Sequence, residues 1–369
     1  MVFYALVSIV VAFIFCNLSK QKNTKKLYCI LTAVCLILLS GLRHPAVGET
    51  SDTFNYINSF NDAARVSWKT IVNGFFPMYF SPSYDGDLQK DPGFTVFEKV
   101  VHYFINTPQL YLILIALLTI VPLSCFIYRN VKDTKSALVA FSYYAFFYFS
   151  YIPNSSIRQS IALSLILLCY NYLQKDKIVK CLLVLFVAST LHKSVLIFLL
   201  FILLHKIKAH KLVYKYAFLL FLLAIFLYQI IVPYMSVLGE IYSGYGESDY
   251  YSDNGHSYNF LIFIGLLYFL TLLPVILKKE KEFDIYKMAY LASSFTLFLS
   301  PLMLIAPAVL RINVFFAVWN FSLIPHSISL YDKTTERLIT MVLLAIFFYM
   351  SIGSINEYMF FWQGPTVRF

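Results

Sequence analysis

The chain has 369 residues, of which 60% are hydrophobic, 18% aromatic and only 13% charged, with a formal net charge of +10. Soluble globular domains carry about a quarter charged residues, so this composition excludes that class and indicates an integral membrane protein. The motifs of soluble enzymes are absent, and the six cysteines fall inside the predicted spans or at their inner ends, which argues against disulfides and a thiolate metal site.

Uncharged apolar runs long enough for a membrane helix recur along the whole chain. The predicted fold class is therefore all-α: a polytopic integral membrane protein of about 12 transmembrane helices, forming a single membrane domain over 1–369. No cleavage pattern follows the first run, so we expect it to be a retained helix rather than a signal peptide. The predicted spans are 2–18, 27–42, 109–128, 136–152, 157–174, 178–192, 194–205, 212–232, 258–277, 286–304, 308–330 and 338–353.

Lys and Arg are unequally distributed between alternate loops. Twenty of the twenty-nine fall on one side of the predicted membrane, which identifies that side as cytoplasmic. Both termini and the two long loops, 43–108 and 233–257, are then expected outside. The net positive charge is thus a topology signal with contacts to anionic lipid, and no nucleic-acid partner is expected.

Ionisable residues avoid the interior of the predicted membrane. The middle of every span is free of Asp, Glu, Lys and Arg. Ion-coupled transporters and proton pumps need carboxylates or their partners near the midplane, so this pattern argues against both classes.

Two spans begin at their outer ends with an arginine in the first turn. The segment "PNSSIRQ" places Arg158 just after the expected cap residues Asn154 or Ser155, and "APAVLRIN" places Arg311 just after Pro307. A helix N-terminus with a guanidinium beside it favours an anion such as a phosphate or diphosphate. Taken alone, an arginine at a span end is more often a snorkelling anchor than a ligand group.

The turn between the sixth and seventh spans, "STLHKSV", carries His192 and Lys193. Both flanking spans are short, so we expect this turn to lie below the outer surface. Lipid is a poor neighbour for these side chains there, which favours a cavity or an anionic partner.

The segment "GLRHPAVGETSDTFNY" (41–56) follows an uncharged run and supplies Arg43, His44, Glu49 and Asp52 within ten positions. Three arginines are expected on this outer face together with two histidines, which favours a common anion site: Arg43, Arg158 and Arg311, with His44 and His192. No metal is expected, although Asp52 with Glu49 could hold one.

The outer loops are rich in aromatic residues, which either stack on sugar rings or form an interfacial belt. Within the first loop, 54–72 and 93–105 have helical apolar spacing and are expected to be helices along the outer interface. The remaining cations of this loop are expected to be solvated: Arg65, Lys69, Lys90 and Lys99.

Six short segments, in order, resemble the EpsG-like branch of the bacterial Wzy-type polysaccharide polymerases: "GLRHPAVG", "DTFNY", "DPGF", "NSSIRQSIALSL", "ASTLHKSVLIF" and "LRINVFF". They span 41–316, most of the chain. Two departures concern acidic residues: Asp52 lies four residues after Gly48 where the family usually has two, and "DPGF" more often begins with Glu.

The resemblance implies a membrane glycosyltransferase of the lipid-phosphate-sugar type. It would act in the bacterial cytoplasmic (inner) membrane, with its active site facing the periplasm or cell exterior, and join undecaprenyl-diphosphate-linked repeat units of an O-antigen, capsule or exopolysaccharide. The growing glycan would pass from its lipid diphosphate to the non-reducing end of another lipid-linked unit. The implied partners are this lipid-linked donor and acceptor, membrane lipid and a chain-length regulator, and no cofactor is expected.

Such a transfer needs a stabilised leaving diphosphate and a base for the acceptor hydroxyl. We assign Arg158 and Arg311 to the donor diphosphate. Arg43 either helps there or holds the diphosphate of the acceptor, and Lys193 is a further diphosphate-binding candidate. His192 is the first choice of base.

Other residues stay open as alternatives. The alternative bases are Asp52, Glu49 and His44, and the candidate sugar contacts are His44, Glu49, Tyr56 and Gln159. Three rival functions also stay open: an O-antigen ligase, a flippase for lipid-linked oligosaccharide, and a membrane O-acyltransferase.

Overall fold

The computed structural model describes residues 1–19, 23–45, 52–80, 91–208, 210–231, 258–278, 281–304, 308–355 and 358–363. In these ranges the regular secondary structure is helical, apart from one isolated antiparallel bridge between Arg43 and Phe360. The chain divides into two compact units, Met1–Phe198 with Asp332–Phe369, and Leu199–Tyr331. That they form one membrane domain stays a prediction.

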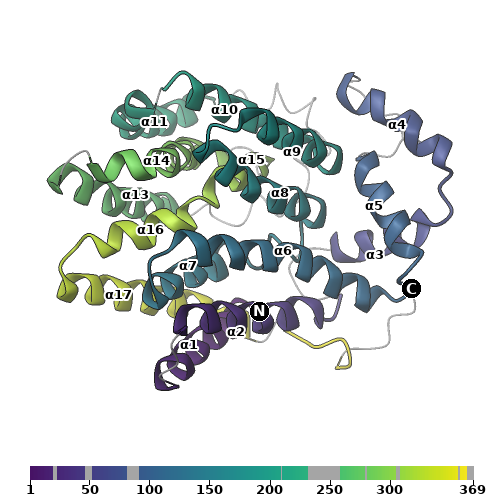
Figure 1. Ribbon diagram of the computed structural model, residues 1–369, viewed down its shortest axis with the longest axis horizontal. Helices are drawn as coiled ribbons and strands as arrows, with labels where there is room; N and C mark the ends of the chain where they lie inside the picture. Colours follow the sequence, from purple (N-terminus) through teal and green to yellow (C-terminus); the bar gives the residue numbers. More distant parts are fainter. Residues whose placement is uncertain are drawn as a thin grey trace. The chain divides into compact units, whose positions relative to one another are not determined.

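The first unit contains the helices that carry most of the predicted site residues. In Figure 1, α1, α2, α6 and α7 lie alongside one another in this unit. Its elements are α1 (Val2–Leu18), α2 (Thr24–Gly41), α3 (Asp52–Ala63), α4 (Trp68–Phe80), α5 (Pro92–His102), α6 (Pro108–Asn130), α7 (Thr134–Phe147), α8 (Ile157–Gln174), α9 (Ile178–Leu191), η1 (Lys193–Ile197), α17 (Lys333–Ser351) and η4 (Ile352–Ile355).

Helix α7 forms the centre of the first unit. Every residue from Ser136 to Ala145 is buried, as expected for a helix that is apolar or small on all sides. At the end of α2, Gly41 permits close contact with α6, because an added Cβ would lie only 2.9 Å from Cγ1 of Ile113. The amide of Gln109 also donates to the Gly41 carbonyl. The backbones of α2 and α6 therefore approach each other closely at Gly41.

Several helices of the first unit expose apolar stripes. On α9 the exposed residues Val179, Leu183 and Phe186 follow helical spacing, and on α17 Met341 and Met350 are exposed. Such stripes are too apolar for water but suit lipid, which does not drive apolar side chains inward. The prediction of a helical membrane protein is consistent with these faces.

Three of the described helices are long and apolar enough, by length and composition, to cross a membrane: Thr24–Gly41, Pro108–Asn130 and Lys333–Ile355. Shorter apolar helices are Val2–Leu18, Ile178–Leu191, Tyr216–Phe226 and Leu261–Leu273. The predicted count of twelve spans is thus not confirmed, although helices occupy the predicted positions.

Several of the predicted helices are divided, among them 308–330 and 54–72. The expected span 308–330 breaks at Val318 and Trp319, where i to i+3 hydrogen bonds replace part of the α-helical pattern. The expected helix 54–72 is interrupted after Ala63, and its two parts are α3 and α4. Placement of these parts along a membrane interface stays a prediction.

The second unit is a separate helical cluster. Its core includes the fully buried Phe201, Phe316 and Trp319, with ring centroids 5.2–6.0 Å apart between Phe201 and the other two. Its elements are α10 (Phe198–Lys206), α11 (His210–Ile231), α13 (Tyr258–Lys278), α14 (Lys281–Leu299), η3 (Pro301–Leu304), α15 (Ala308–Ala317) and α16 (Asn320–Ser329).

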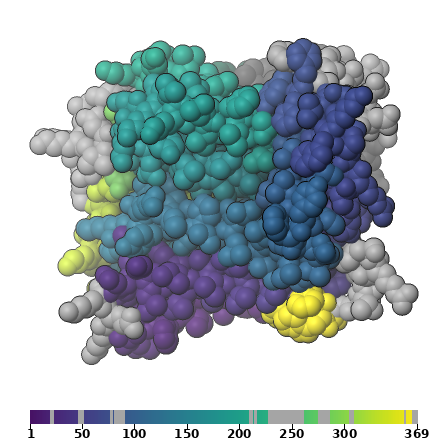
Figure 2. Space-filling model, turned by 45° about the vertical axis from the view of Figure 1, so that its right-hand side comes forward, coloured from purple at the N-terminus to yellow at the C-terminus, as the bar shows by residue number. Residues whose placement is uncertain are grey.

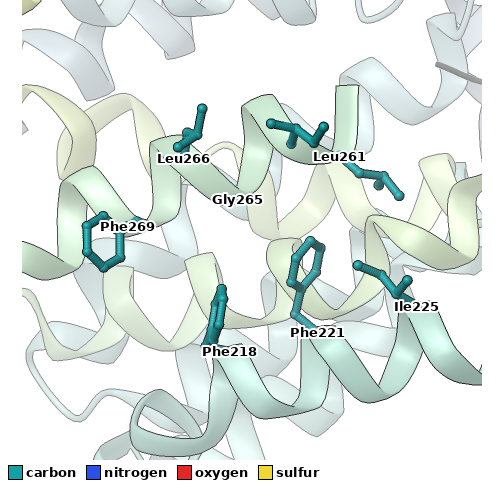
Figure 3. Close-up of a pocket in the computed structure, with 8 residues that line it drawn as sticks. Phe218, Phe221, Ile225, Leu261, Gly265, Leu266 and Phe269 are labelled. Carbon is teal, nitrogen blue, oxygen red and sulfur yellow. The ribbon is translucent and has the colours of Figure 1, made fainter. Parts of the chain in front are cut away.

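An apolar pocket of about 370 Å³ lies between α11 and α13 of the second unit. Figure 3 shows Phe218, Phe221 and Ile225 of α11 opposite Leu261 and Phe269 of α13. The lining offers hydrocarbon contact and no charge. The predicted loop 233–257 lies outside the described residues.

Candidate functional site

Asp91 immediately precedes α5 and directs its carboxylate away from that helix. An Asp at this position normally accepts a hydrogen bond from the second or third helical N–H, but the Asp91 side chain makes no such bond. Instead Oδ2 lies 2.7 Å from Nη1 of Arg158, and the side chain is only 7% exposed. The carboxylate thus serves a tertiary contact at the expense of its local capping role.

Arg158 lies in the first turn of α8, as predicted, and its side chain is 26% exposed. Besides the ion pair with Asp91, its Nε donates to the Tyr56 hydroxyl at 3.5 Å, and its guanidinium carbon lies 5.7 Å from the centroid of that ring. The guanidinium is therefore oriented by α3 and by the start of α5, while part of the side chain stays accessible.

The cap residue of α8 differs from the prediction. The N-cap is Ser156, not Asn154 or Ser155. Asn154 is used elsewhere, because its side chain accepts a hydrogen bond from Ser40 at 2.8 Å and donates to the Phe149 carbonyl.

His192 joins this cluster from a third part of the chain. Helix α9 ends at Leu191, and His192 has an extended backbone before η1 begins. Its Nδ1 lies 3.7 Å from Asp91 Oδ2, longer than a hydrogen bond. The neighbouring Lys193 is exposed. One carboxylate thus lies between a guanidinium and an imidazole.

Gly93 explains how Asp91 comes so close to the end of α9. A Cβ built on Gly93 would lie 2.6 Å from Cβ and 2.7 Å from the carbonyl oxygen of Thr190, and would also overlap the Thr190 hydroxyl. Real Cβ atoms do not approach other atoms so closely. The absence of a side chain at Gly93 is therefore what permits this contact between α5 and α9.

A second carboxylate, Glu98, lies two helical turns after Asp91 and is fully buried. Ser59 donates to Oε2 at 2.7 Å, and Tyr111 donates to Oε1 at 2.9 Å. Burial raises the pKa of Glu98 to about 7, while the two hydroxyls and the charge of Arg158 oppose the rise. Glu98 therefore changes charge near neutral pH.

Arg43 is fully buried and contacts the loop that leads into α8. Nη1 donates to the Ser40 carbonyl at 2.5 Å, and Nη2 donates to the Asn154 carbonyl at 3.2 Å and to the Thr53 hydroxyl at 3.5 Å. Burial lowers the pKa of Arg43 to about 10, so the guanidinium stays charged at neutral pH. In this structure its contacts join α2, α3 and the loop before α8.

The C-terminal residues 358–363 pass over this arginine. The Phe361 N–H donates to the Leu42 carbonyl and the His44 N–H donates to the Met359 carbonyl, each at 2.9 Å. Figure 2 shows this segment, in yellow, on the surface beside the N-terminal helices drawn in purple and blue. The strap formed by 358–363 covers Arg43 and His44.

The remaining predicted site residues lie in different places. His44 is buried, and Asp52 is the half-buried first residue of α3, outside the ion pairs found among the described residues. Gln159 is buried and accepts from the Tyr151 hydroxyl at 3.0 Å. Arg311 is a half-buried residue of α15 in the second unit. Three residues named in the predictions lie outside the described residues: Glu49, Lys90 and Pro307.

Lys99 was predicted to be solvated, and this prediction is wrong. Its side chain is buried and donates to the carbonyls of Ala63, Ala64 and Val66 at 2.8–3.3 Å. It also lies 5.4 Å from the Trp68 ring centroid. These carbonyls follow the end of α3, where a cation is favourable. The lysine therefore stabilises the break between α3 and α4.

We expect Lys99→Met to lower stability by about 1–2 kcal/mol, because the carbonyls lose their charged donor. Thermal unfolding of the purified protein in detergent measures the change. Lys69→Met is the matched control, since Lys69 is an exposed lysine of α4 in the same region. Equal melting temperatures for the two variants would contradict this role.

Asp91 and Glu98 were not among the predicted site residues. Asp91 was visible as the first residue of "DPGF", and its seven-residue spacing from Glu98 places both on one face of a helix. That spacing is the signal that could have indicated the pair. Among the described residues, no group of three or more His, Cys, Asp or Glu could hold a metal ion.

Apolar exposed helices and a polar cluster built at helix ends define a helical membrane protein with a charged site. The model of the EpsG family matches residues 26–362, and the chain belongs to the EpsG family. This confirms the predicted family and points to a glycosyltransferase-like role of the polysaccharide-polymerase type. The comparisons with curated proteins and with solved structures each gave no match.

Proposed function

We propose that the protein polymerises undecaprenyl-diphosphate-linked oligosaccharide units at the outer leaflet of the bacterial cytoplasmic membrane. The growing glycan leaves its lipid diphosphate and is joined to the non-reducing end of another lipid-linked unit. The observation that carries this proposal is the meeting of Arg158, Asp91 and His192, from three separate parts of the chain, in one cluster. The match to the EpsG family supports the reaction type.

Arg158 is the residue that binds the donor diphosphate. Its planar guanidinium suits phosphate oxygens, it lies in the first turn of a helix, and it is partly accessible. As the glycosidic bond to the diphosphate breaks, negative charge grows on the leaving oxygen. A fixed guanidinium there lowers the barrier without further reorganisation.

His192 accepts the proton of the acceptor hydroxyl, and Asp91 orients the imidazole. In the structure without substrate, Asp91 lies closer to Arg158 than to His192. A diphosphate at Arg158 competes for the guanidinium and lets the carboxylate accept from the imidazole N–H. A carboxylate in that position stabilises the imidazolium that forms. Donor binding thereby prepares the base.

Arg43 contributes as a positioning residue. Its hydrogen bond to the Asn154 carbonyl fixes the loop that leads into α8, four residues before Arg158. The assignment of Arg311 and Lys193 to the diphosphate stays a prediction, and alanine variants in a polymerisation assay test it.

The test compares glycan size profiles from cells that lack the chain and cells complemented with variants. We expect the deletion to leave a single repeat unit, and Asp91→Asn to leave predominantly short products. Asp62→Asn is the matched control because Asp62 is an exposed aspartate of α3. Long chains in the deletion strain would contradict the function.

The product also separates the polymerase from the ligase. A ladder of chains on undecaprenyl diphosphate supports a polymerase. Glycan joined to lipid A core as the product of this protein would support a ligase.

A further inference from the structure

Glu98 is a buried ionisable group that the proposed reaction does not use. Its two oxygens accept from Ser59 of α3 and Tyr111 of α6, so three helices meet at this carboxylate. A buried carboxylate is costly, and no cation lies within ion-pair distance of Glu98 among the described residues. A neutral Gln would form a similar bridge between hydroxyls, so a structural role alone does not explain a carboxylic acid here.

Arg158 and Glu98 are connected through α3. Arg158 donates to the Tyr56 hydroxyl, and Glu98 accepts from Ser59, one turn further along the same helix. Asp91, which precedes α5 two turns before Glu98, contacts the guanidinium directly. Two carboxylates therefore lie near Arg158: Asp91, which contacts it, and Glu98, which is more deeply buried. The charge of the second decides how strongly the cluster attracts an anion.

The groups around Glu98 come from every neighbouring element. Helix α3 contributes the hydroxyls of Tyr56 and Ser59, α6 contributes Tyr111, and α8 contributes Arg158. Of the charged residues at or on α5, Asp91 lies two turns away, and Lys99 donates to the carbonyls at the end of α3. His192 lies on the far side of Asp91. Ser59, whose hydroxyl donates to Glu98, is half-buried.

We propose that Glu98 is a positioning residue that acts through Arg158, taking up one proton from solvent when Arg158 binds a diphosphate. The proton binds a carboxylate oxygen and returns to solvent when the anion leaves. This inference rests on the proposed role of Arg158 as the diphosphate ligand.

The pH dependence follows from the pKa of Glu98, which burial raises to about 7. Below this value the carboxyl is neutral, and only Asp91 offsets the positive charge of Arg158. Above it, Glu98 is negative and opposes an anion. The affinity for diphosphate should therefore fall as the pH rises through 7. We expect the decrease caused by this one added negative charge to be on the order of tenfold.

The experiment measures binding of two probes, inorganic diphosphate and undecaprenyl diphosphate, by calorimetry with the purified protein in detergent. Titrations at pH 6 and pH 8, each in two buffers of different ionisation enthalpy, give affinity and proton uptake. In Glu98→Gln we expect tight binding at both pH values and less proton uptake. Because Gln does not titrate, the pH dependence that remains in this variant measures the titration of the diphosphate probe itself.

A second variant separates the charge effect from altered packing. The Tyr111 hydroxyl lowers the pKa of Glu98, so Tyr111→Phe should move the fall in affinity to higher pH. Ser59→Ala should act in the same direction. A merely structural role would lower the melting temperature without moving this midpoint.

The outcomes distinguish the inference from the proposed function. If Arg158→Ala abolishes binding, but wild type and Glu98→Gln share the same pH dependence and proton uptake, the inference is overturned and the function stands. If Glu98→Gln does not fold, an unmoved midpoint in both hydroxyl variants overturns the inference. If Arg158→Ala binds as well as wild type, or wild type binds neither probe, the proposed function fails first.

Discussion

Arg158→Ala is expected to reduce chain growth by roughly 10²–10³-fold, by analogy with the loss of one preorganised donor at a developing anion. The guanidinium is held by Asp91 at 2.7 Å and by the Tyr56 hydroxyl at 3.5 Å, so it is already oriented before substrate arrives. Arg158→Lys keeps the charge but loses the planar pair of donors. Its activity should lie between those of wild type and the alanine variant.

In vitro polymerisation with purified lipid-linked repeat units measures these rates. Arg65→Ala is the matched control, because Arg65 belongs to the turn after α3 and its side chain is 88% exposed. We expect it to polymerise at the wild-type rate. Near wild-type chain growth by Arg158→Ala would refute the diphosphate assignment.

Gly93→Ala is expected to lose most polymerase activity, with Gly93→Val at least as severe. The new Cβ meets both the side chain and the carbonyl oxygen of Thr190, so α5 must move away from α9. That movement separates Asp91 from His192, which reach each other only across this contact. A displacement of about 1 Å at a catalytic group can cost on the order of 10² in rate.

Gly353→Ala provides the control for Gly93→Ala, because a Cβ at Gly353 would meet nothing within 4 Å. The double variant Gly93→Ala with Thr190→Ala should stay inactive, since the backbone carbonyl still obstructs α5. Melting temperatures of the purified variants identify any that unfold. A folded and fully active Gly93→Ala variant would show that the close contact is not needed for catalysis.

The sequence predicted the helical elements well because their determinants are local. Apolar runs bounded by charged or polar residues placed α1 and α8 at the observed residues, and the ends of several other helices within a few positions. The break in 308–330 was not predicted, since uninterrupted apolar character does not distinguish a continuous helix from two. The break after α3 was missed for another reason: it depends on Lys99, thirty-six residues from Ala63.

Within the site, the sequence indicated Arg158 and His192, because a cation or imidazole at a span end conflicts with lipid wherever it occurs. It did not indicate their partner. Asp91 resembles an ordinary helix cap, and only the packing of Gly93 against Thr190 brings its carboxylate to both residues. Arg43 was expected at the diphosphate, whereas its observed contacts are with Ser40, Thr53 and Asn154; a diphosphate role stays a prediction.

The sequence by itself determined the helical membrane class, the EpsG family and the arginine in the first turn of α8, since hydropathy and motif order are properties of the linear chain. Only the tertiary structure decided which carboxylate accompanies that arginine and that Glu98 is buried with two hydroxyl donors. The physical reason is that the charge state of an acid depends on its three-dimensional neighbours and its access to water, and residues distant along the chain set both.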